Sequence, residues 1–290
     1  MSLEASSTFG FEKAWFVKAL KKISEDETIF LKSRTKEAQI YFSIGSKKVE
    51  ALHKWLIGAG LAEGSRTRTQ ISKIGGIISH YDPGLYEYGT WFVILYNLGS
   101  YPHTPEIVYW YLNEFKTLEF TLSDLKAALH QYGDFGKSYV DNAWQALKNT
   151  FSYNSSTPFG EEFRLFEEVD SKNGIYRKRY PQKEYIHPLI FAYCIVDWTK
   201  RNKKETVIIA DIASAKGLPG RLLNLPERIT EELLTDIDIK YRKRVFDVDR
   251  KAGLNRISIF IKEPDKLLHG YYEEVIKNCG PEEVISILTS

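Results

Sequence analysis

The sequence predicts an α+β fold, mostly helical, built from tandem winged helix-turn-helix units with small β-hairpin wings and aromatic scaffold helices. Two observations predict it. Apolar residues recur at helical spacing over most of the chain, and three times two helical segments precede extended segments around a turn. The first unit, with N-terminal and scaffold helices, covers residues 1–116. The second covers 117–185, and the third, with C-terminal helices, covers 186–290.

Composition sets limits on the class of protein. A chain of 290 residues with 43% apolar residues can bury a core in two or three units. Forty basic and 38 acidic residues leave a formal charge of +2, so any affinity for nucleic acid must come from charge placement. The cysteines, Cys194 and Cys279, form no paired motif and give no sign of a disulfide framework. No apolar run is long enough to span a bilayer, and residues 1–7 lack a signal core. We therefore expect a cytoplasmic protein without a membrane partner.

The first unit opens with an amphipathic helix over residues 8–23 and a second helix over 35–42. Lysines line the outer side of the opening helix, where a solvated face is the more common explanation than a binding stripe. These two helices lead into residues 42–78, which form the strongest winged-helix pattern of the chain.

Within residues 42–78, Val49, Leu52 and Leu56 recur at helical spacing and predict a buried stripe. The opposite side carries small and basic residues. An extended segment and a basic tip follow, and Ser72 then caps a further helix. A helix whose exposed side carries small and basic residues fits a major groove, and an arginine-bearing wing can reach neighbouring phosphates. The alternative is a winged helix that packs only against protein.

Two apolar, aromatic-rich helices follow the turn at Asp82-Pro83-Gly84, over residues 88–98 and 106–115. They predict a buried scaffold. Aromatic side chains can also stack on unpaired bases, but at helical spacing packing in the core is the favoured interpretation.

The second unit begins with Thr121-Leu122-Ser123-Asp124, a capping-box sequence, followed by a second helix over residues 136–151. A hairpin is predicted over 162–169 and 175–180, around Asn173-Gly174. The basic run in its second strand either meets a phosphate backbone or protects a sheet edge from aggregation.

The third unit repeats this order. A buried helix is predicted over residues 188–198, and a short apolar element over 206–215 is also predicted to be helical. Asn224 is the expected cap of the next helix, which runs to about residue 237. Strands over 241–248 and 254–261 then flank a basic tip, and closing helices occupy 266–290.

The expected partner is double-stranded DNA, contacted by basic side chains on the helix faces and wings. The candidate DNA-binding residues are Lys47, Lys48, Lys54, Arg66, Arg68, Arg177, Lys178, Arg179, Arg250, Lys251 and Arg256.

The sequence marks no catalytic residue by spacing. His80, Asp82 and Glu87 come nearest to a metal-binding cluster, but a carboxylate before Pro83 more often caps a turn. His53 lies on the flank of the apolar stripe, which favours packing over base contact. No glycine-rich nucleotide loop is present. No catalytic residue, metal site or cofactor is assigned, and a divalent metal is expected only if the protein cleaves DNA.

Several short segments in a fixed order carry a family resemblance: Thr8-Phe9 with Trp15 and Lys18; Ile44-Gly45-Ser46-Lys47-Lys48 before Trp55-Leu56 and Gly60-Leu61; Asn113-Glu114-Phe115; and Pro219-Gly220-Arg221 with Ala252-Gly253-Leu254. In these segments the chain resembles a bacterial family, first catalogued as a domain of unknown function, that includes the SspB-like DNA-nicking component of phosphorothioation systems. The resemblance implies a partner of enzymes that replace a non-bridging phosphate oxygen of DNA with sulfur.

The opening of the chain departs from that family. The resemblance implies a Gly-His-Glu-Thr-Phe run with an arginine three residues later, but Ser6, Ser7 and Glu12 occupy the His, Glu and Arg places. The resemblance therefore supports the function of a DNA-binding subunit in a modification or defence system better than it supports DNA nicking by this protein. A protein-interaction scaffold is a further alternative. Other subunits of such a complex and a second copy of the chain are the possible protein partners.

Overall fold

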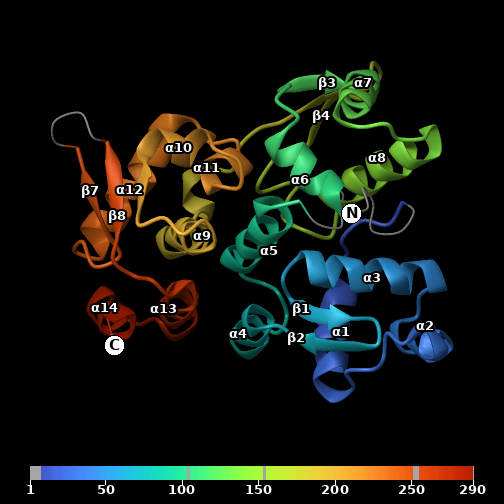
Figure 1. The fold of residues 1–290 in the computed structure, drawn as a ribbon, viewed down its shortest axis with the longest axis horizontal. Coiled ribbons are helices and arrows are strands. Elements are labelled where there is room, and N and C mark those ends of the chain that lie inside the picture. The colour runs from blue at the N-terminus through green and yellow to red at the C-terminus, as the bar shows by residue number, and fades with distance from the viewer. Residues whose placement is uncertain (1–7, 103–104, 153–154, 251–254, 290) are drawn as a thin grey trace. The chain divides into compact units, whose positions relative to one another are not determined.

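The computed structural model describes residues 8–102, 105–152, 155–250 and 255–289. It confirms a mostly helical α+β fold with small antiparallel sheets. The chain forms two compact units, Met1–Tyr180 and Pro181–Ser290 (Figure 1). The first two segments predicted as winged helices fall in the first unit, apart from residues 181–185. The third falls in the second unit.

The first unit starts with helices and a two-stranded hairpin, and Figure 1 shows α3 alongside that hairpin. The elements are α1 (Lys13–Glu25), the 3-10 helix η1 (Lys32–Arg34), α2 (Thr35–Phe42), α3 (Ser46–Gly58), β1 (Ala62–Ser65), β2 (Arg68–Ile71) and α4 (Lys73–Tyr81). Ser43, with a φ of 56°, ends α2 in the left-handed region and turns the chain toward α3. The predicted cap of α4 is confirmed, because the Ser72 hydroxyl accepts a hydrogen bond from the Gly75 amide at 2.9 Å.

The predicted scaffold helices are confirmed as α5 (Tyr88–Ser100) and α6 (Glu106–Asn113), and both are buried along most of their length. Trp91, Trp110 and Tyr111 are among the largest buried side chains of the protein. Their rings pack edge-on or stacked against phenylalanines from later segments, such as Trp91 against Phe159 and Trp110 against Phe115. These aromatic side chains of the unit therefore pack in its core.

The remaining elements of the first unit are β3 (Glu119–Thr121), α7 (Leu122–Tyr132), α8 (Lys137–Phe151), β4 (Glu167–Asp170) and β5 (Ile175–Arg177). The predicted capping box is confirmed, with reciprocal hydrogen bonds between Thr121 and Asp124. The hairpin is shorter than predicted. A further strand, β3, was not predicted; it pairs with β5 and gives a sheet in the order β3-β5-β4.

The second unit consists of η2 (Lys183–Tyr185), α9 (Pro188–Arg201), β6 (Thr206–Ile208), α10 (Ile209–Ser214), α11 (Pro219–Leu222), α12 (Glu227–Lys240), β7 (Phe246–Asp249), β8 (Arg256–Ile259), α13 (Pro264–Lys277) and α14 (Pro281–Thr289). Its three-stranded sheet has the order β6-β8-β7. None of the helices in the described ranges combines the length and the apolar character needed to cross a bilayer.

Of two local predictions for the second unit, one is confirmed in part and one is wrong. The segment predicted to be helical over 206–215 is helix α10 from Ile209 to Ser214, but it begins as strand β6, because its first residues pair with β8. Asn224 does not cap α12: it has a φ of 53°, and the helix begins after Pro226. A proline just before the first turn fits because that position needs no amide donor.

Candidate nucleic-acid interface

The helix α3 presents two different faces. Val49, Leu52 and Leu56 are buried, as the apolar stripe predicted. On the opposite side solvent reaches Lys47 and partly Lys54, but Ala51 and Gly58 are buried, so the prediction that small residues of this side face a groove is wrong at those two positions. The short turn Ser43-Ile44-Gly45 joins the end of α2 to the start of α3.

Three cations from separate elements act electrostatically on one carboxylate of α3, Glu50. Lys54 Nζ lies 2.8 Å from Glu50 Oε1. This hydrogen bond is the largest influence that lowers the pKa of Glu50. Burial opposes it, and the charges of Arg66 and Lys32 lower the pKa further. We call Lys32, Lys54, Arg66 and Glu50 the α3 basic cluster. Because it holds three positive charges against one negative charge, it can attract a phosphate.

Arg66, at the tip of the β1–β2 hairpin, is held in place by two contacts. Its Nε donates to the Phe30 carbonyl at 3.0 Å, and its Nη2 lies 3.5 Å from the Thr35 hydroxyl at the start of α2. A guanidinium carries five N–H donors, so an anchored arginine can still donate to an anion. The wing tip and the start of α2 are thereby fixed relative to each other.

The two lysines that open α3 differ in environment. Lys47 is exposed and forms no ion pair within the described ranges. Lys48 Nζ instead lies 4.6 Å from the Trp15 ring centre and 5.2 Å from that of Phe9. These cation–π contacts direct Lys48 toward the N-terminal segment.

Four candidate residues are engaged elsewhere in the first unit. Arg68 pairs with Glu27 at 2.6 Å, Arg177 Nε donates to Glu119 at 3.0 Å, and Arg179 pairs with Glu167. Lys178 is only 8% exposed, and its ammonium group donates to the carbonyl oxygens of Tyr111 and Phe115. The basic run in β5 and after it therefore forms contacts within the protein.

The candidates in the second unit belong to the β7–β8 hairpin, where Arg256 pairs in register with Asp249, the neighbour of Arg250. Arg250 Nη2 donates to the Thr235 hydroxyl of α12 at 3.3 Å. The Nε of Arg256 is buried and has no hydrogen-bond partner. Lys251 lies outside the described residues. In all, the structure brings together Lys54, Arg66 and Lys32. Lys32 was not among the predicted residues, and its only signal in the sequence is its place just before the start of a helix.

The residues nearest to a metal-binding pattern in sequence do not form a metal site here. Asp82 accepts hydrogen bonds from the amides of Tyr86 and Glu87 and from the Thr90 hydroxyl, at 2.7, 3.0 and 2.7 Å. Both carboxylate oxygens thus accept hydrogen bonds from groups at the start of α5. No group of three or more His, Cys, Asp or Glu side chains able to hold a metal ion occurs among the residues that the structure describes.

The geometry thus defines a mostly helical α+β protein with small antiparallel sheets, in whose first unit Lys54, Arg66 and Lys32 all act on the Glu50 carboxylate. The chain belongs to the family described as "Protein of unknown function (DUF4007)", whose model matches residues 5–272. No curated protein matches the chain significantly in sequence.

Two solved structures share the fold. The magnesium ion-bound SspB crystal structure has a TM-score of 0.76 at 17% identity, with 97% of this chain and 94% of that chain covered. A second SspB crystal structure has a TM-score of 0.76 at 18% identity, with 96% and 90% covered. The expected similarity to the SspB-like family is therefore confirmed at the level of the fold.

Proposed function

We propose that this protein binds double-stranded DNA as a subunit of a DNA modification or defence system of the phosphorothioation type. The α3 basic cluster carries this proposal, because Lys32, Lys54 and Arg66, which come from η1, α3 and the wing, all act on the charge of Glu50, and Lys54 pairs with it at 2.8 Å. Lys47 extends the basic surface at the start of α3. The type of system comes from the family resemblance, which the structural similarity to SspB supports.

In this proposal three winged-helix modules make up most of the chain. Two segments, α6 to β5 and α9 to β8, share the order helix, strand, helix, helix and hairpin, interrupted in the second only by the short α11. In both, the first strand lies beside the last. The segment α1 to β2 follows the same order without a third strand. There a hydrogen bond from the Thr69 amide to the Glu27 carbonyl, at 2.8 Å, takes the place of the strand pairing.

The helices that precede the wings have different outer faces. The middle helix α8 carries the half-buried amides Asn142 and Gln145, a side-chain type that pairs with adenine edges, and the Gln145 amide donates to Asn149 at 3.0 Å. The last one, α12, exposes Glu227 and Glu231, which repel phosphates. We infer that α3 and α8 face DNA and that the third module engages its partners through other surfaces.

Binding to a short duplex at several salt concentrations tests the proposal. We expect affinity to fall linearly on logarithmic axes as salt rises. Lys47→Gln and Lys54→Gln should each reduce the slope by about one unit. Lys200→Gln, at an exposed lysine of α9, is the matched control and should leave the slope unchanged. Binding that is absent, or that does not respond to salt, would reject the proposal.

DNA nicking is a second candidate, favoured because one of the similar solved structures contains a magnesium ion. The described residues of this chain do not fit a metal site, since Asp82 is engaged at α5 and no cluster of ligands is present among them. Supercoiled plasmid incubated with the protein and Mg²⁺ separates the two candidates: open-circle product supports nicking, and intact plasmid that is nevertheless bound supports the binding role.

A further inference from the structure

A cationic pocket in the second unit lies at the C-terminal end of the chain's last hairpin. It has a volume of about 470 Å³, within the range of small-ligand sites. Its lining is Lys243, Arg244, Phe260, Ile261, Lys262, Glu263, Lys266, Leu288 and Thr289. Four of these side chains are cationic and one is acidic. The pocket therefore has the charge of an anion-binding site.

Two of the four cations have no acidic partner. Arg244 and Lys266 form no ion pair within the part of the chain that the structure describes. Lys243 pairs with Asp247 at 2.9 Å and Lys262 with Glu205 at 3.6 Å, but both lysine side chains remain more than half exposed. Exposed pairs of this kind are weak, so an incoming phosphate can replace the carboxylate.

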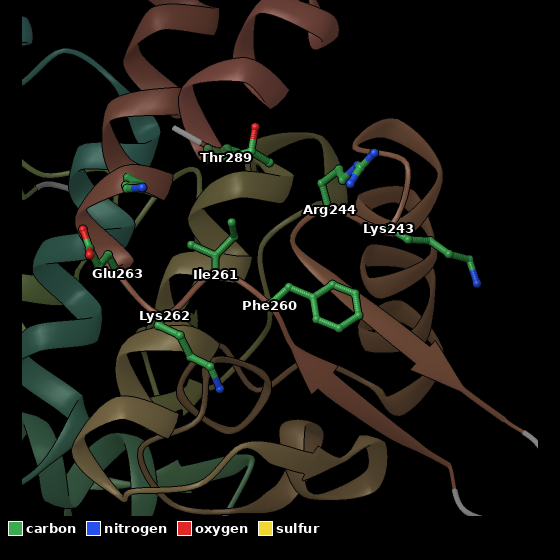
Figure 2. Close-up of a pocket in the computed structure, with 9 residues that line it drawn as sticks. Lys243, Arg244, Phe260, Ile261, Lys262, Glu263 and Thr289 are labelled. Atoms are coloured by element: carbon green, nitrogen blue, oxygen red, sulfur yellow. The ribbon is translucent and has the colours of Figure 1, made fainter.

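An exposed aromatic ring distinguishes this pocket from a simple anion site. Phe260 is 54% exposed, and Figure 2 shows its ring between Lys262 on one side and Arg244 and Lys243 on the other. Backbone hydrogen bonds from Phe260 and Ile261 to the Val245 carbonyl, at 3.1 and 3.3 Å, fix the segment that carries the ring. A fixed ring between cations is the arrangement that stacks a base while its phosphates are neutralised.

The pocket continues into a second one. A cavity of about 360 Å³ is lined by Arg242, Lys243, Arg244, Glu282 and Ile285, so the two cavities share Lys243 and Arg244. Arg242 and Lys243 have φ values of 49° and 56°, although neither is glycine. Hydrogen bonds from the Lys243 amide to the Asp238 carbonyl and from the Arg244 amide to the Tyr241 carbonyl hold this turn. Arg242 pairs with Glu282 in the second cavity, so the available cations there are Lys243 and Arg244, which both cavities share. Cations along adjoining cavities suit a chain of phosphates better than one phosphate.

We propose that the Phe260 pocket binds an unpaired stretch of single-stranded DNA, with one base stacked on Phe260 and the backbone following Lys262, Arg244 and Lys243. This goes beyond the proposed duplex binding, which depends on the α3 basic cluster of the first unit. The protein then holds duplex and unpaired DNA through different units.

The test measures how the full-length protein binds a fluorescein-labelled oligothymidylate and, separately, a short duplex. Phe260→Leu should weaken binding of the single strand roughly 5- to 100-fold, the range expected for loss of one stacked base. Phe260→Trp should restore it, since a ring is present again. Both variants should bind duplex like the wild type. Tyr101→Leu is the matched control, since Tyr101 is 52% exposed and lies in the first unit.

Further arms identify the ligand. Lys266→Gln should lower single-strand affinity and its salt slope. An oligonucleotide without bases should bind the wild type and Phe260→Leu equally. Thymidine monophosphate and inorganic phosphate should compete far less well than the oligonucleotide. If the monophosphate competes equally well, the pocket takes a free nucleotide and the strand proposal fails.

Other outcomes also overturn the inference. Equal binding of the single strand by Phe260→Leu and wild type, or equal losses for the Leu and Trp variants, would remove the role of the ring. Duplex binding without single-strand binding rejects only this inference. If Lys47→Gln and Lys54→Gln lose duplex binding but keep single-strand binding, the result bears on the proposed function and not on this inference. Thermal unfolding confirms that each variant is folded.

Discussion

The Nζ atom of Lys178 lies 4.1 Å from the centre of the Tyr111 ring and donates to the carbonyl oxygens of Tyr111 and Phe115. The Tyr111 carbonyl lies in the last turn of α6, where backbone acceptors have no partner within the helix and the helix dipole is negative, and the Phe115 carbonyl follows two residues after the helix ends. Lys178, which belongs to a basic run in the sequence, is thus buried and caps the end of the scaffold helix α6.

We expect Lys178→Met to lower the free energy of unfolding by about 2–4 kcal/mol, because two buried carbonyls lose their donor. Arg177→Met is the control at the neighbouring position. It removes only the partly exposed pair with Glu119 and should cost less than about 1 kcal/mol. Urea unfolding of both variants measures the difference, and equal costs would show that the buried contacts contribute little.

Glu50→Gln is expected to increase affinity for duplex DNA. Glu50 is the one carboxylate within the α3 basic cluster, and its removal frees Lys54 from their 2.8 Å pair. Lys54→Gln should have the opposite effect, with a salt slope smaller by about one unit. Fluorescence anisotropy with a labelled duplex measures both. Opposite signs for the two variants are required, and a loss of affinity in Glu50→Gln would contradict the assignment of this face to DNA.

Gly75→Ala should destabilise the first unit by about 2–3 kcal/mol. A Cβ atom at Gly75 would lie 2.0 Å from the Leu61 carbonyl oxygen, so the backbone of α4 or of the segment before β1 must move. Gly76→Ala, on the same helix, meets nothing within 4 Å and should stabilise by up to about 1 kcal/mol. Thermal unfolding distinguishes them, and a shift of the same sign in both would rule out the steric explanation.

The stability of the first unit should fall between about pH 6.5 and pH 4 because of His53. This side chain is 7% exposed and its Nε2 has no hydrogen-bond partner. Burial, with smaller contributions from the charges of Arg66 and Lys54, lowers the pKa of His53 from 6.5 to about 4. The unfolded chain therefore takes up a proton first, and stability is lost as the pH falls through this window.

The expected loss is up to about 3 kcal/mol, from a pKa difference of about two units or more. Unfolding free energies at about pH 7 and pH 4.5, for the wild type and His53→Phe, measure it. The Phe variant removes the titrating group and keeps an aromatic ring beside Phe30. If the variant shows the same dependence on pH in this window, other groups cause it.

Local signals predicted much of the fold. The caps at Ser72 and Thr121 and the apolar helices α5 and α9 were found because each depends on residues within a few positions of one another. The strands β3 and β6 were missed because each has only three residues and is defined by pairing with a distant strand. Glu119, for example, pairs with Arg177.

The sequence alone determined where most helices begin and end and which side of α3 is buried, since periodicity and capping act over one or two turns. Only the tertiary structure decided which cations remain available to DNA. Glu27, Glu119 and Tyr111 come from distant segments to engage Arg68, Arg177 and Lys178, while Lys32 and Arg66 act with Lys54 on Glu50. Charges act over distances in space, and folding sets those distances.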